Sequence, residues 1–100
     1  MGDCGKRAFE TGLRYSGIFE SVPSLTTNED LKEYAERYGL EYIESGEIKK
    51  GNYPVLVVYK DAYEETDSEY HAVFCSDIAP LAKKPIFCII TGWDNLEVKA

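Results

Sequence analysis

Two side chains of this chain, Cys4 and His71, have the types and positions that nucleophilic chemistry requires. Cys4 lies at the predicted first turn of a helix, where the positive end of the helix dipole stabilises a thiolate. His71 is the only histidine and opens an apolar strand late in the sequence. An imidazole can activate a thiol and then protonate a leaving group. The pair therefore predicts a cysteine nucleophile with a histidine base.

Covalent catalysis also needs a group that orients the histidine and space for a substrate. Asp94 is the preferred orienting residue, because it follows the strand after the histidine strand. If those two strands pair antiparallel, the end of the second returns to the start of the first. Asn95 is an alternative, and Asp77 is a poorer one because it follows the far end of the histidine strand. Gly5 would leave room beside the thiol for a substrate carbonyl, and Trp93 is a candidate for the cleft wall.

These residues also have structural interpretations. A cysteine at a helix start can serve as a small apolar residue, and a single strand histidine is more often structural than catalytic. Gly92-Trp93-Asp94-Asn95 has the composition of a turn, and the core is the favoured place for its tryptophan. Cys75 and Cys88 lie within predicted strands, which makes them core residues and possible cross-strand neighbours.

Hydrophobic spacing predicts two helices in the first part of the chain. The first begins after Asp3, a plausible N-cap, and runs to about Tyr15. Thr26-Thr27-Asn28-Glu29 has the pattern of a capping box, and Gly39 is the expected end of the helix that follows. Apolar residues recur at helical spacing between them, at Leu31, Tyr34, Ala35 and Tyr38.

The second part of the chain predicts strands. They are expected at 40–44, 54–59, 70–75 and 85–90, with a short edge strand at 96–99. The run 54–59 is nearly all apolar, which is typical of a strand covered on both faces. Between the strands, an acidic exposed loop is expected at 61–68 and a connector at 77–84. Helices followed by strands predict an α+β fold over residues 1–100 as a single domain, with both helices packed on a mainly antiparallel sheet.

Composition narrows the classes of partner. The net charge of -7 argues against nucleic acid, because neutralising phosphates needs clustered Lys and Arg. The same charge favours a basic protein partner, or serves only solubility. Three cysteines without a CxxC motif predict neither a metal site nor a disulfide framework, and no cofactor is expected. The apolar runs are too short to span a membrane, so the expected location is the cytoplasm.

In their order along the chain, these segments resemble the papain-like cysteine peptidase fold, most of all its small bacteriocin-processing branch. Asp3-Cys4-Gly5 resembles the nucleophile motif at the head of the central helix of that branch. His71-Ala72-Val73 resembles the histidine strand, and Asp94 or Asn95 falls where the orienting residue would follow. The resemblance implies chemistry on an acyl group, with Cys4 as nucleophile, His71 as general base and acid, and Asp94 as orienter.

Two features depart from that family. A glutamine normally precedes the nucleophile and completes the oxyanion hole, whereas this chain contains no glutamine. Loss of one such donor typically lowers the rate by about 10²–10³. The spacing from His71 to Asp94 is also longer than the family's, with residues 77–84 as an apparent insertion.

The leading hypothesis from the sequence is a small cysteine hydrolase, peptidase or acyl-transfer enzyme that acts on a peptide or protein amide through a thioester on Cys4. The alternative is a catalytically degenerate interaction module, such as an acidic phage or bacterial inhibitor of a basic protein. A third interpretation is a structural α+β domain in which Cys4 and His71 are incidental.

Overall fold

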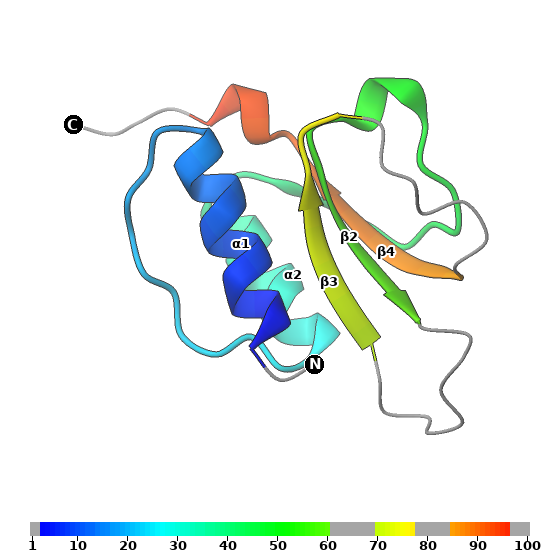
Figure 1. Ribbon diagram of the computed structural model, residues 1–100, viewed down its shortest axis with the longest axis horizontal. Helices are drawn as coiled ribbons and strands as arrows, with labels where there is room; N and C mark the ends of the chain where they lie inside the picture. The colour runs from blue at the N-terminus through cyan, green and yellow to red at the C-terminus, as the bar shows by residue number, and fades with distance from the viewer. Residues whose placement is uncertain (1–2, 61–69, 78–84, 97–100) are drawn as a thin grey trace.

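The computed structural model describes residues 3–60, 70–77 and 85–96, and within them two α-helices pack on one face of a four-stranded antiparallel sheet (Figure 1). The predicted α+β class is therefore confirmed. In chain order the elements are α1 (Cys4–Tyr15), α2 (Asn28–Arg37), β1 (Glu41–Ile43), the 3-10 helix η1 (Lys50–Asn52), β2 (Val55–Lys60), β3 (Tyr70–Cys75), β4 (Ile86–Thr91) and the 3-10 helix η2 (Trp93–Asn95).

Helix α1 is amphipathic, and its apolar side is packed on the sheet. Phe9 and Leu13 have no exposed surface, and they lie four residues apart on the buried face. Asp3 is the N-cap residue, but its side chain makes no capping hydrogen bond. Gly12 lies on the same face and lets the ring of Trp93 approach the helix, since a Cβ built there would be 2.5 Å from the ring. The glycine within the predicted helix is thus a close-packing residue.

Helix α2 begins with a capping box one residue later than predicted. The N-cap is Thr27, whose side chain accepts a hydrogen bond from the backbone N–H of Asp30 at 3.1 Å. The Asp30 carboxylate in turn accepts from the backbone N–H of Thr27 at 3.2 Å. The prediction that Thr26 and Glu29 form this pair is wrong: the helix begins after Thr27, so Asp30 occupies the third helical position and closes the box. Gly39 follows the helix at φ +73°, as expected for its end.

The strands form the order β1-β4-β2-β3, and every pairing is antiparallel (Figure 1). Because β2 lies between β3 and β4, those two strands run in the same direction and do not pair. The condition on which Asp94 was placed beside His71 is therefore not met. Local periodicity identifies strands but does not encode which strand pairs with which.

Strand β2 is the most deeply buried element of the sheet. Val55, Leu56, Val57 and Val58 have no exposed surface, which confirms a strand covered on both faces. The predicted strand bounds agree with the structure to within one residue, and the 70–75 strand agrees at both ends. The 61–68 loop, most of the 77–84 connector and most of the 96–99 strand lie outside the described residues.

A ladder of aromatic rings joins the helices to the sheet. The ring of Phe9 in α1 lies 6.1 Å from that of Tyr34 in α2 and 5.2 Å from that of Trp93 in η2. Trp93 in turn meets Phe74 in β3 at 5.3 Å, and Phe74 meets Tyr15 at 5.5 Å. Edge-to-face pairs of this kind stabilise a core beyond the area that they bury. The ladder fixes the C-terminal end of α1 against η2 and the end of β3.

Candidate functional site

Cys4 is the first residue of α1 and lies beside the start of β3. Its side chain is half-buried, and the thiol donates to the backbone carbonyl of Tyr70 across 3.8 Å. Helix α1 therefore places its N-terminus next to the first residue of the histidine strand, one residue before His71. The structure brings the backbone segments of the two predicted residues together.

The two side chains, however, belong to opposite faces of the sheet. Tyr70, Ala72 and Phe74 pack on the helix side, whereas Val73 and Cys75 pack on the other side. His71 belongs to the second set, because strand side chains alternate between faces. Its imidazole stacks on Tyr59 with ring centroids 5.6 Å apart, and its Nε2 atom is buried. His71 therefore shares a face with Val73 and Cys75, and its imidazole is turned away from α1.

Gly5 does not leave the space beside Cys4 that the sequence predicts. It is buried, and a Cβ built on it would lie 2.4 Å from the backbone carbonyl oxygen of Leu25. The segment before α2 therefore occupies the room that was expected for a substrate carbonyl. The glycine serves close backbone packing rather than an open cleft.

All three candidate orienting residues lie at the far end of the molecule from Cys4. Asp94 and Asn95 are in η2, which adjoins the C-terminal end of α1 through a 2.7 Å hydrogen bond from the Ser16 hydroxyl to the carbonyl of Trp93. Asp77 follows the end of β3, at the same end. The twelve residues of α1 separate this end from Cys4 by roughly 16 Å.

Trp93 occupies the core position that the sequence favoured. It is 1% exposed, and its indole N–H donates to the carbonyl of Ile90 at 2.9 Å. Cys75 and Cys88 are free thiols, and they are not cross-strand neighbours because β2 separates their strands. Burial raises the pKa of both thiols above the ordinary value. Tyr42 also hydrogen-bonds the Cys88 thiol, and burial is the main reason that the pKa of this tyrosine is raised.

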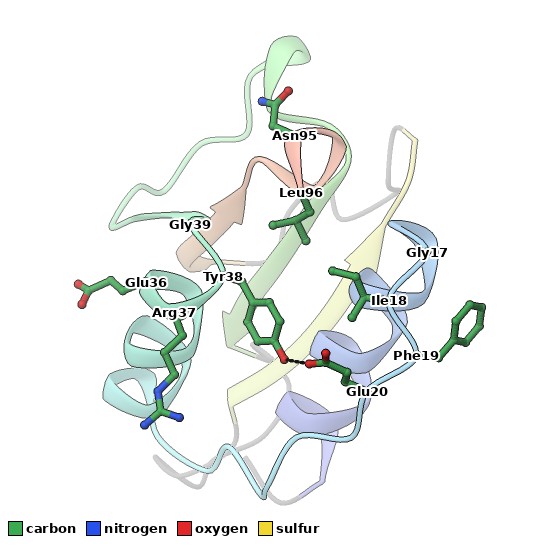
Figure 2. Close-up of a pocket in the computed structure, with 10 residues that line it drawn as sticks. All are labelled: Gly17, Ile18, Phe19, Glu20, Glu36, Arg37, Tyr38, Gly39, Asn95 and Leu96. Carbon is green, nitrogen blue, oxygen red and sulfur yellow. Dashed lines mark hydrogen bonds between the residues drawn. The ribbon is translucent and has the colours of Figure 1, made fainter. Parts of the chain in front are cut away.

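A hollow of about 690 Å³ lies at the end of the molecule that carries η2 (Figure 2). Three elements contribute to it: the segment after α1, the end of α2, and η2 with the residue that follows. The lining residues are Gly17, Ile18, Phe19, Glu20, Glu36, Arg37, Tyr38, Gly39, Asn95 and Leu96. Tertiary structure alone brings these three segments together.

The side chains that line the hollow differ in direction. Figure 2 shows Tyr38 and Glu20 pointing toward one another across it, with Ile18 and Leu96 forming apolar walls. The Tyr38 hydroxyl donates to the Glu20 carboxylate at 2.6 Å. Burial and this carboxylate raise the pKa of Tyr38 to about 12, so the phenol remains a donor at neutral pH.

The remaining charges of the hollow are directed outward. Figure 2 shows Glu36 and Arg37 pointing away from the Tyr38–Glu20 pair. Arg37 is bound to Glu33 at 3.3 Å, and its guanidinium lies 4.9 Å above the ring of Tyr34. No Lys or Arg among the described residues forms an ion pair with Glu20. Among the described residues, the partner of the Glu20 carboxylate is therefore the Tyr38 hydroxyl, not a basic side chain.

Phe19 stands at the rim of the hollow with 83% of its surface exposed. The sequence pattern assigns no role to residues 17–23. Phe19 is the one aromatic residue between α1 and α2, but its position in the sequence does not identify the tyrosine and glutamate that complete the hollow. Those residues meet only because the end of α2 packs next to this segment.

Within residues 3–60, 70–77 and 85–96, no group of three or more His, Cys, Asp or Glu side chains is arranged to hold a metal ion. None of the helices in the described part of the chain is long and apolar enough to cross a membrane. Comparisons of the chain with protein-family models, with curated proteins and with solved structures gave no match.

Proposed function

We propose that this protein is an interaction module that binds a basic protein partner. The observation that supports this proposal is the acidic hollow beside an exposed phenylalanine. Of its two lining carboxylates, Glu20 faces Tyr38 across the hollow and Glu36 points outward, while its one lining guanidinium, Arg37, already pairs with Glu33. Interfaces of this kind combine an apolar anchor with complementary charge on the rim.

The charge of the whole chain acts in the same direction. A net charge of -7 on 100 residues attracts basic proteins over distances of about one Debye length and speeds their encounter. The proposal does not need Cys4 and His71 on one face, and it is therefore compatible with the positions of both side chains.

A fluorescence anisotropy titration tests this function. The probes are two labelled decapeptides that share three leucines and differ only in three lysines or three glutamates. We expect the lysine peptide to bind with 1:1 stoichiometry and to weaken steeply as salt is raised, and Cys4→Ala to bind it equally well. Equal affinity for both peptides, or no binding at low salt, would contradict the proposal.

Thiol chemistry at Cys4 is a second candidate function, and one observation favours it. The Cys4 thiol lies at the N-terminus of α1 and contacts the carbonyl of Tyr70, the residue before His71. Because His71 lies on the opposite face of the sheet, the start of β3 would have to slip by one residue to bring the imidazole to the thiol. In that arrangement Cys4 would attack an amide carbonyl, and His71 would protonate the departing amine.

The pH dependence of alkylation at each cysteine tests this second candidate. Mass spectrometry after short exposure to iodoacetamide measures the rate at Cys4, Cys75 and Cys88 in the wild type and in His71→Ala. A catalytic pair predicts fast reaction of Cys4 near pH 6 that is lost without His71. A Cys4 rate that is unaffected by His71→Ala would contradict a catalytic pair.

A further inference from the structure

We infer that the hollow between the end of α2 and η2 is a slot for one lysine or arginine side chain of the basic partner, with Glu20 as the counter-ion. This inference rests on the proposed function and adds the place and the chemistry of recognition. The evidence is the arrangement of Glu20, Tyr38, Ile18 and Leu96, which is separate from the total charge of the chain.

The walls of the slot match the stem of a long basic side chain. Ile18 and Leu96 provide apolar surface, and the ring of Tyr38 forms a third side (Figure 2). Lysine and arginine carry three or four methylene groups below their charge and bury this stem along apolar surface. A short polar side chain would leave those walls uncovered.

The polar end of the slot matches the charged head. One oxygen of the Glu20 carboxylate accepts the Tyr38 hydroxyl at 2.6 Å, which fixes the carboxylate in place. The other oxygen is available to accept from an ammonium or guanidinium group. A carboxylate that is already positioned loses little side-chain entropy on binding, and its hydrogen bond to a cationic donor is charge-assisted.

Phe19 adds an apolar contact next to the slot. Its ring points outward from the hollow and is 83% exposed, so a residue that flanks the inserted lysine or arginine can pack on it (Figure 2). Aromatic residues, phenylalanine included, are enriched in protein–protein interfaces. The partner segment therefore has a basic residue with an apolar neighbour.

A double-mutant cycle tests the slot. The protein variants are Glu20→Gln and a control, Glu44→Gln, which removes one negative charge from an exposed position outside the hollow. On the peptide side, each lysine of the leucine–lysine probe is replaced in turn by norleucine, which keeps the stem and removes the charge. Anisotropy measures every combination at one salt concentration.

We expect Glu20→Gln to weaken binding of the lysine peptide about five- to tenfold, and Glu44→Gln to weaken it less than about twofold. One norleucine replacement should weaken binding to the wild type but not to Glu20→Gln. Phe19→Ala should also lower affinity by about tenfold, whereas Phe87→Ala, at an exposed phenylalanine outside the hollow, should not. Circular dichroism of each variant confirms that it is folded.

Three outcomes would overturn the inference. If Glu20→Gln and Glu44→Gln lower the affinity for the lysine peptide equally, and binding remains sensitive to salt, the slot is contradicted. The proposed function is then still supported. Tighter binding of the peptide by Lys99→Ala than by the charge-matched control Lys50→Ala would mean that a lysine of this chain competes for the carboxylate, so that the occupant is internal. Absence of binding by the lysine peptide would remove the proposed function and the slot together.

Discussion

Gly12 is the residue at which the packing of α1 against η2 is most sensitive. A Cβ at this position would lie 2.5 Å from the Trp93 ring, which is itself 1% exposed and held by a hydrogen bond to Ile90. The ring cannot move outward without breaking that bond. The absence of a side chain at Gly12 therefore allows α1 and η2 to pack this closely.

We predict that Gly12→Ala lowers the free energy of unfolding by about 1–3 kcal/mol. In a helix without this contact, the same substitution would raise stability by roughly 1 kcal/mol through helix propensity. Gly51→Ala is the matched control, because nothing lies within 4 Å of a Cβ built there. Urea denaturation of the three proteins measures the difference, and a Gly12→Ala variant as stable as Gly51→Ala would contradict the close contact.

Tyr38 makes stability depend on pH in the alkaline range. Its pKa is raised from 10.0 to about 12 in the folded state, by burial first and by the Glu20 hydrogen bond second. The folded protein thus holds a proton that the unfolded chain releases above pH 10. Stability from this group is complete below pH 10 and is lost as the pH rises toward 12.

We therefore expect the free energy of unfolding to fall between pH 10 and 12, by at most about 1.4 kcal/mol per pH unit from this tyrosine. Tyr38→Phe should be less stable than the wild type at pH 8, by about 0.5–1.5 kcal/mol for the lost hydrogen bond, and should show a shallower decline. Urea denaturation across this range measures both curves. Parallel curves would show that Tyr38 does not contribute to the pH dependence.

Among the elements, helix α2 depends on its capping box. Thr27 and Asp30 satisfy backbone N–H groups at the start of the helix that have no partner within it. The helix has ten residues, too few to be stable in isolation, so the cap and the packing of Leu31 and Ala35 on the sheet hold it in place. Tyr38 is its C-cap residue, so the geometry of the hollow depends on this helix.

We predict that Thr27→Ala lowers the free energy of unfolding by about 1 kcal/mol, and that Thr26→Ala lowers it clearly less. The side chain of Thr26 makes only a 3.5 Å contact with the Asp30 carboxylate, whereas that of Thr27 accepts the 3.1 Å capping bond. Thermal or urea denaturation compares the two variants. A larger loss at Thr26 would mean that the cap lies one residue earlier, as the sequence pattern alone suggests.

Strand β4 contains an irregularity that reorients one side chain. Val58 pairs with Cys88 and Tyr59 pairs with Ile86, so Phe87 has no partner across the pairing with β2. Its ring lies 5.3 Å from that of Tyr70, which packs on the helix side of the sheet, and 40% of its surface is exposed. Bulges commonly redirect side chains in this way.

At the scale of the whole molecule, the strand order determines which residues can meet. Strand β2 separates β3 from β4, which places Cys75 and Cys88 on strands about 9–10 Å apart. The two thiols also pack on opposite faces of the sheet. A disulfide requires Cα atoms closer than about 7 Å.

We predict that the folded protein forms no Cys75–Cys88 disulfide under oxidising glutathione. Mass spectrometry of the intact and digested protein, without reductant, detects the two-hydrogen loss and the linked peptides. The control is the same treatment in concentrated urea, where the unfolded chain should form the bond. A linked pair in the folded protein would contradict the strand order.

The sequence by itself determined the elements. Helical spacing identified α1 and α2, and β propensity identified the strands within one residue, because both signals depend on neighbours a few positions away. Alternation also placed His71 on the face of Val73 and Cys75. Tyr70, rather than His71, packs on the helix side of the sheet, and its carbonyl accepts the hydrogen bond from the Cys4 thiol.

Only the tertiary structure decided what surrounds those elements. The insertion of β2 between β3 and β4 separates Asp94 from the start of β3, and the Leu25 carbonyl fills the space at Gly5. The hollow of Glu20 and Tyr38 unites segments that are 18 residues apart in sequence. Such contacts depend on the free energy of the whole arrangement of helices and strands. A local pattern of residues does not predict that arrangement.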